Sequence, residues 1–324
     1  MTPSTEFLIR RLRLRHFQLL EHLGQTGSLR AAAGALSVTQ PAVSKMLHEI
    51  EQAFGMRLFE RGRRGVEPNA FGLIAIHHAR AILGEVDRAA EEINAMRGGA
   101  NAILRLGTLS ITSIVPAAIV DLCARNPGAQ VRIREAALRD LLPMLLDGEL
   151  DCVFGAMTSD ALERPVAEAV GAQMIFEDWI CAIVADAHPL AGAGHSDWTS
   201  LATERWVAPP RETPIRQQFI ASFLQLGLKP PVPVIETLSP VTMIELLRLD
   251  PTLIALVRFE SVRNDTLAGM RRLEIRPRMP LPPLCVLTRA SGGPMPEIVG
   301  EFIAALRRAA KPTRHNRRTP QSAR

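Results

Sequence analysis

The sequence is poor in cysteine and has no long apolar stretch free of charge. Its four cysteines stand far apart in apolar surroundings, so their spacing offers neither a set of metal ligands nor a C-x-x-C redox pair. We therefore expect buried, reduced thiols and neither a metal nor another cofactor. The four residues are Cys123, Cys152, Cys181 and Cys285.

Targeting and membrane-spanning segments are also missing. Arginines crowd residues 10–15, but the polar residues that follow do not form the apolar core of a signal peptide. Arg105 interrupts the best candidate for a membrane-spanning run. The sequence thus predicts a cytoplasmic protein with no membrane partner.

What is present is a globular composition with an uneven charge. The 324 residues are 47% hydrophobic and 22% charged, which fits two or three domains with a sizeable core. Residues 1–66 hold ten Lys and Arg against five Asp and Glu, and residues 307–324 hold seven against none. The segment between them carries a formal charge of −7. A basic head on an acidic body is typical of a protein whose head meets nucleic-acid phosphates.

Three short helices are predicted near the N-terminus. Apolar residues recur at a spacing of three in the first, which gives it one buried face made by Leu14, Phe17, Leu20 and Leu23. Ser28 caps a second helix that ends at Leu36. Thr39 caps a third, with Pro41 in its first turn, where the missing N–H costs nothing.

The third helix has an apolar and a polar face. Its inner face comprises Val43, Leu47, Ile50 and Phe54. The outward residues at its start are Gln40, Ser44, Lys45 and His48. Amides, hydroxyls and a cation in this place suit contacts with base edges and phosphates in a major groove.

Residues 58–66 follow as a tight hairpin whose tip carries Arg61, Arg63 and Arg64. One interpretation is a wing that touches backbone phosphate or the minor groove. The alternative is a solvated cluster of charge, which three arginines alone would favour.

The string Thr-Gln-Pro-Ala-Val-Ser at 39–44, preceded by Gly27–Ala33 and followed by Leu-Phe-Glu-Arg at 58–61, closely resembles the N-terminal domain of LysR-type transcriptional regulators. The resemblance implies a winged helix-turn-helix that binds double-stranded promoter DNA. It assigns base or phosphate contacts to the outward residues, to the capping hydroxyls and to the wing. The candidate DNA contacts are Ser28, Thr39, Gln40, Pro41, Ser44, Lys45, His48, Arg61, Arg63 and Arg64.

A long helix is predicted over 69–97, with Asn69 as its cap. Its apolar residues follow spacings of four and three, as in a coiled coil: Ala75, Ala79, Ile82, Val86, Ala89, Ile93 and Met96. Polar residues such as Glu85, Arg88 and Glu92 surround this seam, which favours dimerisation over simple core packing. Gly98 and Gly99 then break the helix and provide a hinge. The resemblance implies a dimer through this helix and a tetramer of two dimers.

Beyond residue 100, short apolar runs alternate with helical patterns, which predicts βαβ units and a mostly parallel sheet. The pattern restarts after a break, which implies two lobes around a cleft. The expected strands cover 103–109, 130–135, 151–154, 179–184, 206–207, 232–236, 253–257 and 284–288, and the expected helices cover 114–125, 138–147, 214–226, 240–249 and 295–309.

An effector is expected at helix N-termini that follow strands, where N–H groups and the helix dipole favour an anion. The candidate effector contacts are Ser110, Thr112, Ser113, Thr213, Thr237 and Ser239. Each also suits simple helix capping, and the two readings weigh equally. A small organic acid is the expected effector.

The sequence as a whole predicts an α/β protein with a helix-rich winged helix-turn-helix head at 10–67 and a linker helix and hinge at 68–99. A two-lobed, periplasmic-binding-protein-like effector domain with Rossmann-like lobes follows at 100–310, with lobe one at 100–172 and 273–310, lobe two at 173–272, and a disordered basic tail at 311–324. We expect a regulator that acts on RNA polymerase and is not an enzyme. The alternatives are an enzyme or a nucleoid-type protein tethered to a winged-helix head.

Overall fold

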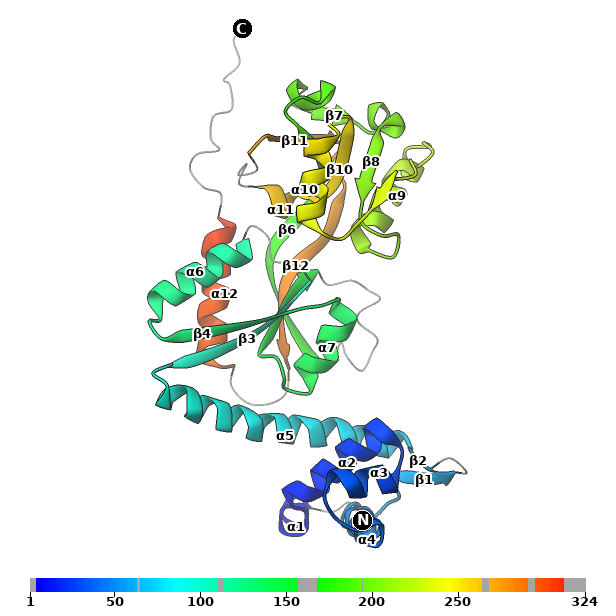
Figure 1. The fold of residues 1–324 in the computed structure, drawn as a ribbon, viewed down its shortest axis with the longest axis vertical. Helices are drawn as coiled ribbons and strands as arrows, with labels where there is room; N and C mark the ends of the chain where they lie inside the picture. Colours follow the sequence, from blue (N-terminus) through cyan, green and yellow to red (C-terminus); the bar gives the residue numbers. More distant parts are fainter. Residues whose placement is uncertain are drawn as a thin grey trace. The chain divides into compact units, whose positions relative to one another are not determined.

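The structure, a computed structural model, describes residues 4–62, 65–109, 114–156, 168–193, 195–263, 268–290 and 295–311. The chain divides into two compact units (Figure 1). The first comprises Met1–Leu106, Gly128–Arg132 and Arg139–Asp151, and the second comprises Gly107–Pro127, Ile133–Leu138 and Cys152–Arg324. Of the predicted tail, only Lys311 lies within the described residues.

The head contains the three predicted helices and one more. Helix α1 (Thr5–Arg11), which we did not predict, begins at Ser4, whose hydroxyl accepts a hydrogen bond from the N–H of Phe7 at 3.3 Å. The others are α2 (Leu14–Thr26), α3 (Leu29–Ala35) and α4 (Gln40–Phe54), followed by the hairpin of β1 (Phe59–Gly62) and β2 (Gly65–Pro68).

The predicted inner face of α4 is largely confirmed, but that of α2 is partly wrong. Val43, Leu47 and Ile50 are buried. In α2, Leu19 is fully buried whereas Leu14 is 48% exposed. A strict spacing of three falls behind the 3.6-residue turn by about 60° at each step, so Leu14 rotates away from the face that buries Leu23.

Helix α5 (Ala70–Arg97) continues from the hairpin and runs for 28 residues. The first part of its apolar seam packs against the head, where Ala75 and Ala79 are buried. The later part is open, since Ile82, Val86, Ile93 and Met96 are between 37% and 70% exposed. One expectation is wrong: Arg88, taken as a polar flank of the seam, is buried.

The body carries one mixed sheet in the order β4-β3-β5-β12-β6-β10-β8-β9, with β11 paired to β6 and β7. Its strands are β3 (Ala102–Thr108), β4 (Ala129–Glu135), β5 (Cys152–Ala156), β6 (Val170–Ala185), β7 (His195–Asp197), β8 (Arg205–Ala208), β9 (Ile235–Glu236), β10 (Leu253–Arg258), β11 (Met270–Arg276) and β12 (Pro280–Arg289). Its helices are α6 (Ile114–Arg125), α7 (Leu138–Leu146), α9 (Pro214–Gln225), α10 (Pro240–Leu249), α11 (Phe259–Val262) and α12 (Glu297–Ala310), with short 3₁₀ turns η2 (Pro189–Gly192) and η3 (Ser200–Thr203).

The expectation of mostly parallel pairing is only partly met. β8 pairs in parallel with β9 and β10, as βαβ units require. Strand β6 is far longer than the predicted 179–184, and it pairs antiparallel with β12, β10 and β11. Its first half borders β12 and its last residues border β10 and β11, so β6 crosses from one lobe to the other.

Aromatic packing defines the core of the second lobe. Trp198, Trp206, Phe219 and Phe223 are at most 1% exposed, and their rings meet mostly edge to face at centroid distances of 4.7–6.1 Å. Three of the cysteines are buried as predicted, but Cys123 is exposed on α6. The helical pattern of 114–125 buries Leu122 on the inner face, which turns the next residue outward.

Candidate nucleic-acid interface and effector cleft

The start of α4 presents polar side chains to solvent. Gln40, Lys45 and His48 are exposed, and Ser44 is half-buried. Residues 40, 44 and 48 are four apart, so they form one stripe along the helix. The helix begins at Thr39, whose hydroxyl accepts from the N–H of Ala42 at 3.4 Å, as predicted. This stripe can offer hydrogen-bond donors and acceptors to a nucleic-acid groove.

Two of these polar side chains, those of Lys45 and His48, form weak contacts within the helix. The ring of His48 lies 3.0 Å from the Gln52 amide nitrogen, and Lys45 lies 3.9 Å from the Glu49 carboxylate. Both contacts are exposed, so each is worth little and is readily exchanged for a contact with phosphate or a base. Pro41 is exposed and sets the first turn of α4.

Ser28 caps α3 as predicted, because its hydroxyl oxygen accepts from the N–H of Ala31 at 3.2 Å. The hydroxyl proton of a capping serine is not used in the cap and can be donated to a phosphate oxygen. Ser28 and Thr39 thus both keep a donor while they cap.

The wing is held by contacts that the sequence did not reveal. One carboxylate oxygen of Glu51, in α4, accepts from the N–H groups of Leu58 at 2.9 Å and Phe59 at 3.2 Å. The N–H of Val66 donates to the carbonyl of Gly27 at 2.8 Å. Arg61 is exposed on β1. The predicted wing contacts Arg63 and Arg64 lie outside the described residues.

The predicted effector residues divide into two groups. Ser110, Thr112 and Ser113 lie outside the described residues, which resume at Ile114. Thr213, Thr237 and Ser239 lie beyond the carboxyl ends of β8 and β9, since the N–H of Thr237 donates to Ala208 at the end of β8 (3.1 Å). The second group therefore gathers at one edge of the sheet, where ligands of α/β folds bind.

The capping roles in this group differ. Ser239 caps α10 by accepting from the N–H of Thr242 at 3.2 Å, and Thr237 accepts from the N–H of Ser239 at 3.1 Å. Thr213 stands at the start of α9 but does not cap it with its side chain, so the capping alternative is wrong for this residue. Its hydroxyl donates instead to the carbonyl of Pro210 at 2.7 Å, because the loop folds back on itself there.

Arg216, in the first turn of α9, was missed by sequence reasoning, since one arginine in a helical pattern carries no distinctive signal. It is 5% exposed. Burial lowers the pKa of its guanidinium, and nearby Glu236 acts in the opposite direction. Within the described ranges, no group of three or more His, Cys, Asp or Glu is placed to hold a metal ion.

Comparison with known proteins decides the family. Residues 14–73 match the family described as "Bacterial regulatory helix-turn-helix protein, lysR family", and residues 97–311 match "LysR substrate binding domain". The chain belongs to the LysR family of transcriptional regulators. Helix α1 lies before the matched residues.

Relatives of this LysR-family chain bear the names of regulators. It is 33% identical over 243 residues to the transcriptional regulator GbpR of Azospirillum brasilense, which covers 74% of this chain and 70% of the relative. It is 28% identical over 215 residues to PcaQ of Agrobacterium fabrum, covering 65% and 68%. The chain is therefore a regulator with a DNA-binding head and an effector-binding domain, and both the enzyme and the nucleoid-type alternatives are discarded.

Solved structures share the fold at low sequence identity. A full-length OxyR variant from Pseudomonas aeruginosa is 20% identical with a TM-score of 0.60, covering 91% of this chain and 97% of that one. Full-length CbnR in complex with its target DNA is 20% identical with a TM-score of 0.51, covering 93% and 100%. At these sequence identities, the two similarities show a shared fold. No helix in the described part of the chain is long and apolar enough to cross a membrane.

Proposed function

We propose that this LysR-family regulator reads promoter DNA with the stripe formed by Gln40, Ser44 and His48, with Lys45 beside it on a phosphate. The observation that carries the proposal is the outward placement of this stripe at the capped start of α4, opposite a buried apolar face. Amide and hydroxyl side chains suit base edges in the major groove, and a lysine suits the backbone. Ser28 and Thr39 add phosphate contacts at two helix starts, and Pro41 holds the turn.

The wing supplies a further contact in this proposal. Arg61 is exposed on β1, and Arg63 and Arg64 follow it closely in the sequence. Arginines on a hairpin suit backbone phosphate or a narrow minor groove.

The test is a binding titration on the promoter DNA upstream of the gene, with the wild type beside Gln40→Ala and Ser44→Ala. Each lost base contact is expected to weaken specific binding by about 1–3 kcal/mol. Gln25→Ala is the control, because Gln25 is an exposed amide on α2 whose side chain bonds only to Glu21 among the described residues (3.3 Å).

Two outcomes of this titration would contradict the proposal. Wild-type affinity in both α4 variants would show that another face of the head reads the DNA. An equal loss in Gln25→Ala would show that the loss is not specific to the stripe.

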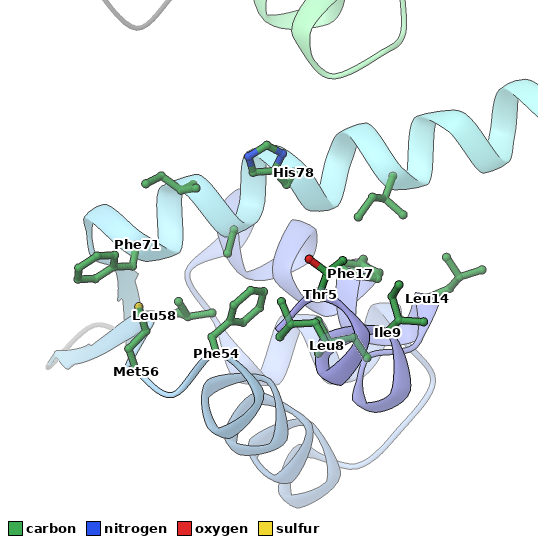
Figure 2. Close-up of a pocket in the computed structure, with 14 residues that line it drawn as sticks. Thr5, Leu8, Ile9, Leu14, Phe17, Phe54, Met56, Leu58, Phe71 and His78 are labelled. Carbon is green, nitrogen blue, oxygen red and sulfur yellow. The ribbon is translucent and has the colours of Figure 1, made fainter. Parts of the chain in front are cut away.

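The head and linker also carry a groove that suits a second copy of the chain. It has a volume of about 610 Å³ and lies between α1, α2, the end of α4 and α5 (Figure 2). Its walls are almost wholly apolar: Thr5, Leu8, Ile9, Leu12, Leu14, Phe17, Phe54, Met56, Leu58, Phe71, Ile74, Ala75, His78 and Ile82. Ile74 and Ile82 belong to α5, whose exposed seam continues from the groove to Val86, Ile93 and Met96.

A self-complementary surface of this kind supports a two-fold dimer, in which the open seam of one α5 covers the groove of the other. Tetramers would then form from two dimers. Ile82→Glu and Ile93→Glu are expected to lower the molar mass measured by light scattering to that of a monomer. Val120→Glu, a matched change at an apolar residue on α6 that is 69% exposed, should leave it unchanged. A monomeric wild type would contradict this part of the proposal.

The effector in our proposal is a small organic acid that binds between the lobes and alters how the heads meet DNA, and through this the recruitment of RNA polymerase in the cytoplasm. The hydroxyls of Thr213, Thr237 and Ser239 at one sheet edge support a polar ligand, and the sequence proposes Ser110, Thr112 and Ser113 as further contacts. A panel of carboxylic acids that shifts DNA affinity in the titration above would support this effector class, and a panel of sugars that alone does so would overturn it.

A further inference from the structure

Arg216 is a buried cation to which the described residues offer neither a hydrogen bond nor an ion pair. Its side chain is 5% exposed, and its Nε and one terminal nitrogen, Nη1, have no hydrogen-bond partner among the described residues. Nor does it form an ion pair within the described ranges. The other buried arginines each have an acceptor at 2.6–2.7 Å: Arg88 at Asp151, Arg105 at Glu91 and Arg263 at the carbonyl of Ala310. Arg216 therefore differs from every other buried guanidinium that the structure describes.

Burial of an unpaired charge is expensive and is normally avoided in a folded protein. Within the described part of the chain, the guanidinium of Arg216 forms a weak cation–π contact with the ring of Phe219, whose centroid lies 5.4 Å from the guanidinium carbon. Since the fold gains nothing from a lone buried cation, its retention indicates a partner that this chain does not itself supply.

The place of Arg216 points to the kind of partner. Residues 216, 219 and 223 are three and four apart, so they share the inner face of α9, and Phe219 and Phe223 are fully buried in the lobe core. Arg216 is at the N-terminal end of that face, in the first turn of α9. The helix dipole makes this end partly positive, which adds to the charge of the guanidinium.

Hydroxyl groups lie around the same sheet edge. Thr213 precedes α9, and Thr237 follows β9, where its N–H is bonded to the end of β8. Arg211 adds positive charge nearby, and Glu236 at the end of β9 is close enough to influence Arg216 but forms no ion pair with it in the described structure. A small anion fits this arrangement better than a neutral molecule.

We propose that Arg216 anchors a carboxylate at the carboxyl ends of β8 and β9, so that the acid group of the effector is held by the guanidinium fork in lobe two. The inference rests on the proposed effector class. A planar carboxylate accepts two parallel N–H bonds from one edge of the guanidinium, either from Nε and Nη2 or from Nη1 and Nη2, and each edge includes one of the two nitrogens that lack an acceptor among the described residues. The hydroxyls of Thr213 and Thr237 then orient the rest of the molecule.

The experiment measures thermal unfolding of the full chain in acetate, benzoate or succinate at constant ionic strength, with chloride as the reference anion. A ligand that binds only the folded state raises Tm as its concentration rises. We expect at least one of these carboxylates to raise the Tm of the wild type. The matched control is Arg271→Met, an exposed arginine paired with Asp186 at 2.7 Å, and it should respond like the wild type.

Arg216→Met should behave differently in two ways. Its Tm in chloride should exceed that of the wild type, because the buried unpaired charge is gone. It should also lose the response to carboxylates. A lower Tm in chloride would show that the guanidinium stabilises the fold by itself, and an equal carboxylate response would place the anion elsewhere. Either result overturns the proposal, as does a wild type that responds to none of the three carboxylates.

Arg216→Lys keeps the charge and removes the fork, so it tests bidentate binding separately. Its half-maximal carboxylate concentration should be several-fold higher than that of the wild type, and an unchanged value would contradict bidentate binding. None of these measurements includes DNA. A failure of the Arg216 site is therefore distinguishable from a failure of promoter reading by α4, which the titration with Gln40→Ala tests separately.

Discussion

The guanidinium of Arg88 in α5 donates to a carboxylate oxygen of Asp151 at 2.6 Å and to the carbonyl of Gly148 at 2.5 Å, and both side chains of the ion pair are buried. The other oxygen of Asp151 accepts from the backbone N–H of Arg105 in β3 at 2.7 Å. One aspartate thus ties the linker helix to the start of the effector domain.

Other side chains of α5 form ion pairs close to this contact. His77 and Arg80 lie 3.4 Å and 3.5 Å from the carboxylate of Asp147, and Glu91 pairs with Arg105 at 2.6 Å. Positions 77, 88 and 91 are each two residues after a seam position, a rotation of about 200° around the helix. Helix α5 therefore has an apolar face that is exposed along its later part and a polar face fixed to its own chain.

Arg88→Met is expected to lower the free energy of unfolding by about 3–5 kcal/mol, because it leaves the Asp151 carboxylate buried without its cation. Adding Asp151→Asn should recover part of that loss, since asparagine keeps an acceptor for the N–H of Arg105 but carries no charge. Denaturant unfolding measures both. Arg248→Met, which breaks an exposed pair with Glu245, should cost no more than about 1 kcal/mol. Equal effects of the two methionine variants would contradict a stabilising role for the buried pair.

Local patterns in the sequence predicted much of this structure. The caps at Ser28, Thr39 and Asn69 and the extent of helix α5 were all predicted correctly, because each depends on residues within a few turns of one another. The role of Arg88 was not predictable, since Asp151 is 63 residues away and only the tertiary fold brings them together. The same limit applies to Arg216: a sequence shows that an arginine is present but not that its surroundings leave it without an acceptor.

Gly65 in the wing should not tolerate a side chain. Its φ is +138°, and a Cβ there would lie 2.2 Å from the carbonyl oxygen of Gly27. Gly65→Ala is expected to cost about 1–3 kcal/mol of stability and to weaken DNA binding, because the hairpin must shift away from α2. Gly62→Ala is the matched control, since nothing lies within 4 Å of its Cβ position. The prediction is wrong if the two alanine variants unfold at the same denaturant concentration.

The four cysteines should react in two classes. Cys123 is exposed, whereas Cys152, Cys181 and Cys285 are buried. Burial also raises the pKa of Cys181 and Cys285, which keeps their thiols protonated and unreactive. A chromogenic disulfide reagent should modify one thiol per chain in the native protein and the rest only on unfolding. Cys123→Ser should remove the reaction of the native protein. A fast-reacting thiol that remains in that variant would contradict the burial of the other three.

Helix α11 joins the lobes through charges of opposite sign. One oxygen of the buried Glu260 carboxylate accepts from the N–H of Ile114 at the start of α6, at 3.1 Å. Three residues later, Arg263 donates to the carbonyls of Ala309 and Ala310 at the end of α12, at 3.0 Å and 2.7 Å. A carboxylate at a helix N-terminus and a guanidinium at a C-terminus both oppose the helix dipoles favourably.

Glu260→Gln keeps the side-chain shape and an oxygen acceptor but removes the charge, so we expect a loss of about 0.5–2 kcal/mol. The loss should be local, with faster amide hydrogen exchange in the first turn of α6 and little change in the aromatic core of lobe two. Glu245→Gln, which removes an exposed carboxylate on α10, should alter neither exchange nor stability noticeably. If exchange at the start of α6 stays as slow as in the wild type, the Glu260 contact does not hold that helix end, and the lobes are joined there without it, by Arg263 and by the strands β6 and β12.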